Sequence, residues 1–454
     1  MLVEGLSSFF GTLDILRPAF TRPGFDNLVA IFIGWVLTNG PHAVTQALVA
    51  AGVPGRRHHE AFHRFFSRGT WIPDQVGRLL FDKVMAKLIA SDAPIRAVID
   101  DTLAVKKGPE VFGIGSHLDP VRSTKAYRVF AFGHVWVVLA IVVSVPFSQR
   151  SWALPVLFRL YRNKKECMKK GVRYRKKTEL AREMTAILAS WAPERRIEIA
   201  ADSAYCNATV VKGRPKNVVF FGDMRPDATL TAQPPRRVRR GRCGRRPVRG
   251  RNLPKPSVLA ADKRRPWEEC ELTLYGSTRT VYYKTLDAQW YRACGADLIR
   301  IVVVRVDTGN ARIRVFFSTD TSIEPPEILR VYSGRWSIEV CFRDMKQHLG
   351  FSDSSARKKE AVERTAPFVG YIYTALVLWF CDGVWQAQFA TPPLRPWYRH
   401  KKGLCFADVV RAAQRVLVHV DVLDPGRSLD NLRELEPLRR QRPLRRAQTK
   451  RRAA

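Results

Sequence analysis

One segment of the chain carries four polar side chains of complementary chemistry: Tyr332, Arg335, Glu339 and Lys346. If the segment is an α-helix, all four project within about 60° of one another at 100° per residue. One stripe would then present a hydroxyl, a guanidinium, a carboxylate and an ammonium group. An exposed helix face with ion pairs between residues four apart would show the same spacing. The stripe is flanked by apolar residues, namely Trp336, Ile338, Phe342 and Met345. Such flanks favour a buried helix whose polar stripe lines a cleft.

Two further acidic sites follow short apolar runs that read as strands. Ile95–Ile99 ends in Asp100 and Asp101, and Ile197–Ala201 ends in Asp202. A carboxylate at the tip of a strand lies where open sheets bind ligands. The residues alone do not decide between Asp100 and its neighbour Asp101.

Three carboxylates brought together from two strands and a helix would repel one another unless cations neutralise them. Oxygen ligands with open positions suit Mg²⁺ or Mn²⁺. Two such ions about 3.5–4 Å apart stabilise the attacking and the leaving oxygen of an in-line phosphoryl displacement. The set therefore predicts metal-dependent cutting or transfer of a phosphodiester.

The charge of the chain points to a polyanionic partner. It has 77 Lys and Arg against 41 Asp and Glu, a formal charge of +36, and 46% hydrophobic residues, which excludes a disordered polycation. Residues 236–251 hold nine Arg, residues 439–454 hold eight Lys and Arg, and residues 162–177 hold nine against one acid. A single run could be a solvated tail, but three runs favour phosphate contact.

The elements around these residues fall into five segments. Residues 1–92 form a helical N-terminal domain with helices at Leu28–Leu37, Ala43–Ala51 and Gln75–Ala90. Within it, Thr45–Phe66 resembles a helix-turn-helix, a possible site for binding DNA ends. A common helical pair without DNA contact is the alternative.

Residues 93–207 and 326–390 form an α/β core with a mixed sheet and flanking helices. Its predicted elements are strands at Ile95–Ile99, Tyr127–Phe132, Val135–Val145 and Ile197–Ala201, and helices at Thr178–Trp191 and from Pro326 to about Leu349. Residues 208–325 form a β-rich insertion with an Arg-rich loop. Its predicted strands are Asn217–Phe221, Glu271–Tyr275, Thr280–Tyr283, Leu298–Val306 and Arg312–Ser318. Residues 391–454 form a C-terminal region with a basic, disordered tail.

No membrane association is predicted. Val135–Pro146 is too short to cross the roughly 30 Å hydrocarbon layer as a helix, and Phe368–Cys381 reads as a core helix. The N-terminus lacks the basic region of a signal peptide. We expect a cytoplasmic, nucleoid-associated protein.

The spacing Y-x2-R-x3-E-x6-K from Tyr332 to Lys346 resembles the YREK signature of DDE transposases of bacterial insertion sequences, in insertion-sequence family 4 and its family 701 relatives. Asp100-Asp101-Thr102 resembles their D-x-T motif, which favours Asp100 as the first acid. Asp202 with Tyr205 resembles their second motif, an Asp followed three residues later by Tyr or Phe. The intervals of 102 and 137 residues between the three acids also resemble the family, over roughly residues 90–385.

This resemblance implies an RNase H-like fold in which Asp100, Asp202 and Glu339 bind two Mg²⁺ (or Mn²⁺) ions and catalyse strand cleavage and transfer. It implies that Tyr332, Arg335 and Lys346 contact DNA phosphates. The partners would be double-stranded DNA, as transposon terminal inverted repeats and target DNA, and a second copy of the chain in a homodimer on DNA. Some relatives stack a flipped base on a tryptophan; Trp267 and Trp290 are candidates, and neither is assigned.

Two alternatives remain open. A catalytically idle DNA-binding protein derived from a transposase would have the same sequence pattern. The segment His59-Glu60-Ala61-Phe62-His63 matches the zinc-protease motif H-E-x-x-H, but it needs a third ligand, and a protease gives no reason for the charge. The chain has no phosphate-binding G-x-x-x-x-G-K-[ST] segment, so no NTP hydrolysis is expected.

Overall fold

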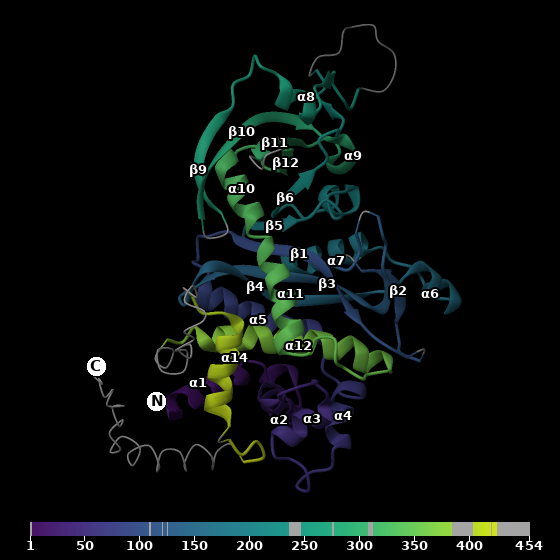
Figure 1. Cartoon of the computed structure of the whole chain (residues 1–454), viewed down its shortest axis with the longest axis vertical. Coiled ribbons are helices and arrows are strands. Elements are labelled where there is room, and N and C mark those ends of the chain that lie inside the picture. Colours follow the sequence, from purple (N-terminus) through teal and green to yellow (C-terminus); the bar gives the residue numbers. More distant parts are fainter. Residues whose placement is uncertain are drawn as a thin grey trace, which may run out of the picture. The chain divides into compact units, whose positions relative to one another are not determined.

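The computed structural model of the chain describes residues 2–108, 110–119, 121–124, 126–235, 247–274, 277–306, 312–383, 403–418 and 420–424 (Figure 1). By packing, the chain divides into two compact units, Met1–Phe65 with Leu376–Ala454, and Phe66–Ala375. The five predicted segments follow sequence patterns instead, and their boundaries stay predictions. Most of the Arg-rich stretch and the basic C-terminal tail lie outside the described residues.

The smaller unit is helical. Its helices are α1 (Leu2–Asp14), the 3-10 turn η1 (Arg17–Ala19), α2 (Arg22–Leu37), α3 (Val44–Ala50), α4 (Glu60–Ser67) and α14 (Phe406–Leu417). Helix α2 is its centre and is buried almost throughout. At Gly34 of α2 a side chain would meet the carbonyl oxygen of Ala47 at 2.0 Å, so glycine lets α2 and α3 touch through their backbones.

The larger unit is built on one mixed sheet. Its strands are β1 (Ile95–Val105), β2 (Gly115–Leu118), β3 (Phe130–Val145), β4 (Ser148–Tyr161), β5 (Ile197–Ala201), β6 (Val218–Met224), β7 (Leu230–Thr231), β8 (Asn252–Leu253), β9 (Glu268–Leu274), β10 (Ser277–Gln289), β11 (Leu298–Val306) and β12 (Arg312–Ser318). The order is β2-β3-β1-β5-β6-β12-β11-β10-β7-β8, with β4 on β3 and β9 on β10.

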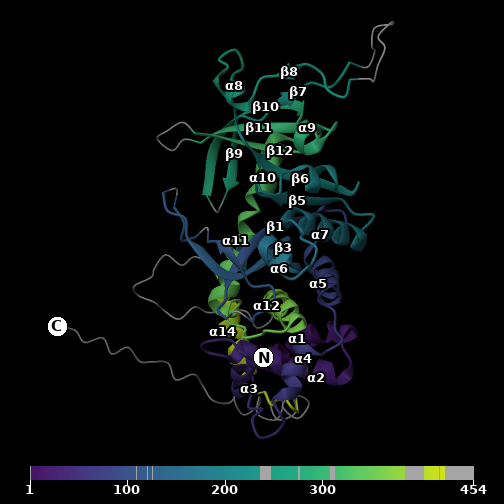
Figure 2. The ribbon, with the colours of Figure 1, turned by 90° about the vertical axis from the view of Figure 1, so that its right-hand side faces the viewer.

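Helices flank this sheet. They are α5 (Pro73–Leu88), α6 (Lys164–Lys169), α7 (Lys177–Trp191), the π-helix η2 (Ala208–Lys212), α8 (Pro256–Ala261), α9 (Tyr291–Cys294), α10 (Pro325–Ser333), α11 (Trp336–His348) and α12 (Lys359–Phe380). Figure 2 shows α11 on one side of β1 and β3 and α7 on the other. α12 contains the apolar run that the sequence assigned to a core helix, and it is buried.

Strands β4-β3-β1-β5-β6 lie in that spatial order. β3 runs antiparallel to both β1 and β4, whereas β1, β5 and β6 are parallel. This arrangement of a mixed sheet with flanking helices is consistent with an RNase H-like fold. β3 is a run of Val, Ile and Ala buried on both faces, as expected of a central strand covered by helices.

Two strand predictions for this region were incomplete. The runs predicted at Tyr127–Phe132 and Val135–Val145 form one strand, β3, which begins at Phe130. Strand β4 was missed because Pro155 and Arg159 interrupt its apolar pattern. Pro155 lies where the register between β3 and β4 shifts, a place where the ladder tolerates a missing N–H. Arg159 is paired with Asp74 at 2.7 Å and with Glu183 at 2.6 Å.

The strands predicted for the β-rich insertion join the same sheet as the core. β6 pairs in parallel with β5, and β12 pairs antiparallel with β6, so the ladder runs on without interruption into β11 and β10. β11 and β12 have the predicted bounds. None of the helices within the described ranges combines the length and the apolarity that crossing a bilayer requires.

Candidate active site

Three acidic residues lie where the parallel strands of the sheet end their pairing. Ile99 of β1 pairs with Ala201 of β5, which pairs with Gly222 of β6. The next residue on each strand is an aspartate: Asp100, Asp202 and Asp223. Neighbouring strands are about 4.8 Å apart, so the three backbone positions lie close together.

The sequence predicted that Asp100 ends its strand, and this prediction is wrong. β1 continues to Val105, and its second half pairs with β3. Asp100 instead marks the end of the parallel ladder with β5, which stops at Ile99 and Ala201. Beyond this point β1 runs beside the loop that carries Asp202.

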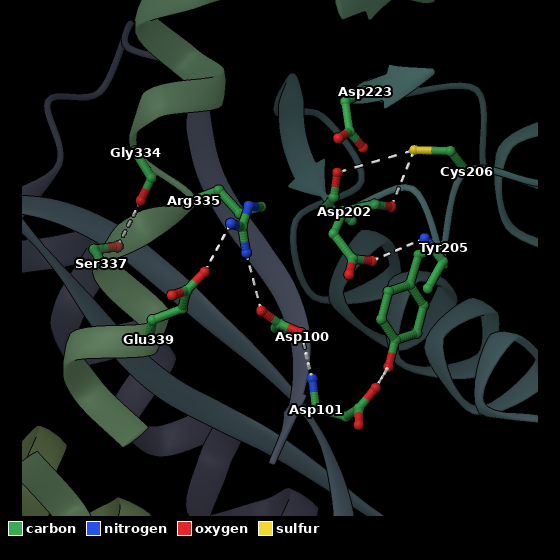
Figure 3. Close-up of polar contacts among 12 residues, drawn as sticks. Asp100, Asp101, Asp202, Tyr205, Cys206, Asp223, Gly334, Arg335, Ser337 and Glu339 are labelled. Atoms are coloured by element: carbon green, nitrogen blue, oxygen red, sulfur yellow. Dashed lines mark hydrogen bonds and ion pairs between the residues drawn. The ribbon is translucent and has the colours of Figure 1, made fainter. Parts of the chain in front are cut away.

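Arg335 joins two of the predicted acids from different elements. Its Nη1 donates to Oδ2 of Asp100 at 3.0 Å, and its Nη2 donates to Oε1 of Glu339 at 2.7 Å. Figure 3 shows the guanidinium between these two carboxylates, with Asp202 and Asp223 on the neighbouring strands. Asp100 and Arg335 are largely buried, with side chains 16% and 15% exposed. The predicted residues Asp100, Arg335 and Glu339 therefore meet in one place.

The electrostatics of this cluster show an excess of negative charge. Burial, and then the charge of Asp202, raise the pKa of Asp100 to about 7, although Arg335 opposes the shift. Burial likewise raises the pKa of Asp202, Arg335 opposes this, and Asp101 and Asp223 add to the rise. One guanidinium therefore does not compensate the carboxylates around it.

Asp223 is a site residue that the sequence interpretation missed. Its side chain lies 3.4 Å from Arg314 of β12, and its Oδ1 is buried without a hydrogen-bond partner among the described residues. The signal was available, because Asp223 follows the apolar run of β6 as Asp202 follows that of β5. It was overlooked because β6 was assigned to the insertion.

Asp101 lies on the opposite face of the sheet from Asp100. Its carboxylate accepts a hydrogen bond from the hydroxyl of Tyr205 at 2.7 Å and one from Nζ of Lys177 at 2.6 Å. Tyr205 is buried and follows Asp202 in the loop after β5. Its bond to Asp101 ties that loop to β1 (Figure 3), which gives the tyrosine a physical role in holding Asp202 in place.

The predicted helix over residues 326–349 is divided into α10 and α11. Between them, Arg335 N bonds to Tyr332 O and Ile338 N bonds to Arg335 O, so the chain passes through a tighter turn with bonds to the third residue back. Projection at a constant 100° per residue is therefore wrong across Gly334, because a tighter turn advances about 120° per residue.

The consequence is clearest at Tyr332. Its ring is buried and packs on Phe316 of β12, with centroids 4.7 Å apart. The guanidinium of Arg335 lies 5.9 Å from the ring centroid. Burial, and then the charge of Asp223, raise the pKa of the Tyr332 hydroxyl. Tyr332 lines the site through its ring and does not take part in the Arg335 bridge.

Lys346 lies about two turns beyond Glu339 in α11 and is not in contact with the acidic cluster. Its side chain is exposed to solvent, yet surrounding protein lowers the pKa of its ammonium group while the charge of Asp119 opposes the shift. An exposed cation in such a position is available to an anion.

The chemistry of the donor set fits divalent cations. Four carboxylates lie in the cluster against two guanidiniums: Asp100, Asp202, Asp223 and Glu339 against Arg314 and Arg335. Arg335 bonds to both Asp100 and Glu339. As they stand, no three His, Cys, Asp or Glu side chains in the described ranges are arranged to hold a metal ion.

The H-E-x-x-H segment finds no support as a zinc site. Helix α4 begins at Glu60, so His59 lies before its first turn. The rings of His59 and His63 are 5.8 Å apart, and Glu60 is paired with Arg64 at 2.6 Å. No third ligand completes a site within the part of the chain that the structure describes.

The segment that resembled a helix-turn-helix is looser than that motif. Helices α3 and α4 are separated by residues 51–59, whereas the motif has a turn of three or four residues. A surface pocket is formed by α3 and the segment that follows it, with a lining that includes Leu48, Val49, Val53, Arg56, Arg57, His58 and His59. Arg56 is paired with Asp421 at 2.7 Å.

The described basic run, residues 162–177, forms α6 and the loop that leads to α7. Its exposed cations are Lys164, Lys165, Lys169, Lys170, Arg173 and Lys176. The run ends at Lys177, whose ammonium group holds Asp101 beside the acidic cluster. An exposed, strongly basic segment thus ends at Asp101, on the face of the sheet opposite Asp100.

Comparison with known protein families gives two matches. The model of the DDE superfamily endonucleases matches residues 16–292, more than half of the chain. The model of an archaeal ISC1217-type transposase matches residues 289–378, which include α10 and α11. No curated protein matches the chain.

Proposed function

Because the chain belongs to the DDE superfamily of endonucleases, we propose that it is a DNA transposase that cuts transposon ends and joins them to target DNA. Members of the superfamily generally use divalent metals. The observation that carries the proposal is the bridge from Asp100 through Arg335 to Glu339, with Asp202 on the adjacent strand.

In this proposal Asp100, Asp202 and Glu339 hold two Mg²⁺ or Mn²⁺ ions. When bound, these ions would neutralise the scissile phosphate and activate an oxygen nucleophile. Burial and mutual repulsion raise the pKa values of both aspartates, so a cation bound between them would be stabilised. The hydrogen bond from Tyr205 to Asp101 holds the Asp202 loop against β1, which keeps the two aspartates in register.

Arg335 exchanges partners in the proposed reaction. With Asp100 and Glu339 holding metal, the guanidinium of Arg335 would be free to bind a phosphate oxygen of the DNA. Lys346, an exposed cation on the same helix, contacts a phosphate further along the strand. Tyr332 supports Arg335 through its ring. The residue pattern supports assignment to insertion-sequence family 4 or 701, and the acting form would be a homodimer on DNA.

The test uses the purified full chain, DNA from both flanks of its gene, and Mg²⁺ or Mn²⁺. We expect specific nicking by the wild type. Glu339→Gln should lower the nicking rate by about 10³-fold or more, because it removes a metal ligand, while DNA affinity stays within a few-fold.

Glu327→Gln is the matched control. Glu327 is a carboxylate on α10 that pairs with Arg96 and Arg330, away from the cluster, and its loss should leave nicking near the wild-type rate. Binding of DNA without cleavage in either metal would favour the alternative, an idle DNA-binding protein derived from a transposase.

A further inference from the structure

The hairpin formed by β2 and the start of β3 has an unusually apolar exposed face. We define the arm as residues 115–119, 121–124 and 126–132. Five of the fourteen large apolar side chains that the structure describes as exposed belong to it: Leu118, Val121, Tyr127, Phe130 and Phe132. Phe130 is 62% exposed, Phe132 64% and Tyr127 71%. So many exposed rings in so few residues indicate a binding surface.

The arm presents these rings on the same face of the sheet as Asp100. Asp100 pairs with Val138 of β3, and alternate residues of a strand share a face. From Val138 that face runs through Trp136 and His134, which are buried, to Phe132 and Phe130, which are not. The cross-strand partner of Phe130 is Leu118, so its apolar surface continues across both strands.

Hydrogen bonds connect the arm, and the end of β1 beside it, to neighbouring segments. Nζ of Lys106 donates to the carbonyl oxygens of Ser352 at 2.8 Å and Ser354 at 2.6 Å, in the segment after α11. Nδ2 of Asn163, beside α6, donates to the carbonyl oxygen of Ser116 at 3.4 Å. Figure 1 shows β2 and α6 at the same edge of the sheet. The bond from Asn163 and the pairing of β2 with β3 connect the arm to the sheet that carries Asp100.

The chain carries exposed cations within and just before the arm. Arg122 and Arg128 lie within it and Lys107 precedes it; Arg122 is paired with Asp119 at 2.7 Å. The charge of Asp119 in the arm acts on Lys346 of α11, so the arm lies beside a proposed phosphate contact. Exposed rings interleaved with cations are typical of surfaces that bind single-stranded nucleic acid, where bases stack on the rings and phosphates meet the cations.

We propose that the arm binds unpaired DNA next to the cleavage site, with bases stacked on Phe130 and Phe132. The distance fits this use: from Val138, opposite Asp100, to Phe132 is six residues, roughly 20 Å along a strand. The inference rests on the proposed function only in placing DNA at Asp100.

The test measures affinity in EDTA, so that it does not depend on cleavage. The probes are a fluorescent oligothymidylate of about 20 nucleotides and a blunt duplex of similar length. The double variant Phe130→Thr with Phe132→Thr keeps the β propensity of the strand. It should bind the single strand about tenfold or more weakly, because two stacked bases are lost, and bind the duplex within about twofold of wild type.

Two further variants serve as controls for the stacking interpretation. Val258→Thr removes an exposed apolar side chain on α8, outside the arm, and should change neither affinity. Phe132→Trp preserves a stacking ring and should keep single-strand affinity, with its added tryptophan fluorescence quenched by oligothymidylate. That quenching would be absent if the ring had only a structural role.

Equal loss of both affinities, or no loss of either, would overturn the proposal. So would self-association of the wild type without DNA that the double variant abolishes, since the arm would then bind a second copy of the chain. Failure of the proposed function is a separate outcome: the wild type would nick no DNA, yet the affinities in EDTA would still follow the arm.

Discussion

Asp100 and Asp101 are neighbours on β1, and the pleat sends their side chains to opposite faces of the sheet. On one face Asp101 is satisfied by Lys177 and Tyr205. On the other, Asp100 shares one guanidinium with Glu339 and is repelled by Asp202, and its pKa is raised to about 7. The same residue type is thus neutralised by the protein on one face and left in need of a cation on the other. We propose that this difference separates the structural carboxylate from the catalytic one.

The largest expected effect is on DNA cleavage by the two asparagine variants. Asp100→Asn should lower metal-dependent nicking by about 10³-fold or more, because it removes a proposed metal ligand. Asp101→Asn should leave nicking within about tenfold of wild type at a temperature where the variant is folded. The measurement is the nicking rate of each variant on the same DNA substrate. Similar losses of rate in both variants would contradict the assignment of a catalytic role to Asp100 and a structural role to Asp101.

The folding stability of the same variants should change in the opposite order. Asp101→Asn leaves Lys177 without its ion pair and weakens the bond from Tyr205, so we expect it to lower the free energy of unfolding by roughly 2 kcal/mol. Tyr205→Phe, which removes only the hydroxyl, should cost about 1 kcal/mol. Urea unfolding in EDTA measures both. A variant of Asp101 as stable as wild type would show that Lys177 and Tyr205 do not depend on it.

The pH dependence of stability should single out Asp100. Its pKa is about 4 in the unfolded chain and about 7 in the folded one, so between these values the folded state binds more protons. Stability from this group is therefore present at low pH and lost as the pH rises through 7. In EDTA, Asp100→Asn should match wild type near pH 4 and exceed its free energy of unfolding by about 4 kcal/mol at pH 8, because three pKa units correspond to that energy.

The control for this pH effect is Asp101→Asn, which keeps the carboxyl of Asp100. Urea midpoints across the pH range provide the comparison. A gap between Asp100→Asn and wild type that is constant with pH would mean that the carboxyl of Asp100 does not titrate in this window.

The smallest expected effect concerns Lys346, which lies outside the acidic cluster. Lys346→Ala should weaken DNA binding a few-fold and reduce the slope of log affinity against log salt by about 0.9, the value for one phosphate contact. The matched control is Lys83, a lysine on a different helix, α5, that is not among the proposed site residues. Lys83→Ala should leave the slope unchanged, and a wild-type slope for Lys346→Ala would remove its phosphate role.

The sequence predicted much of the sheet because its apolar runs are dense. β5 and β11 have the predicted bounds, and Asp202 follows β5 as expected. It could not predict β4, where Arg159 is compensated by Asp74 and Glu183 from other elements. Such pairing depends on tertiary structure and leaves no local pattern.

The site was predicted in part for a similar reason. Glu339 and Arg335 lie four residues apart, so their contact follows from helix geometry. The burial of Tyr332 depends on the tight turn at Gly334 and on Phe316 of a distant strand. The role of Asp223 depends on the parallel pairing of β6 with β5. Neither the packing of Tyr332 on Phe316 nor the pairing of β6 with β5 leaves a local pattern in the sequence.

The most direct test of the central claim is binding of Mn²⁺ to the full chain on DNA, followed by electron paramagnetic resonance. We predict that wild type and Asp101→Asn bind with similar affinity, and that Asp100→Asn, Asp202→Asn and Glu339→Gln each bind at least about tenfold more weakly, since each removes a ligand. Unchanged Mn²⁺ affinity in these three variants, or a loss confined to Asp101→Asn, would contradict the account.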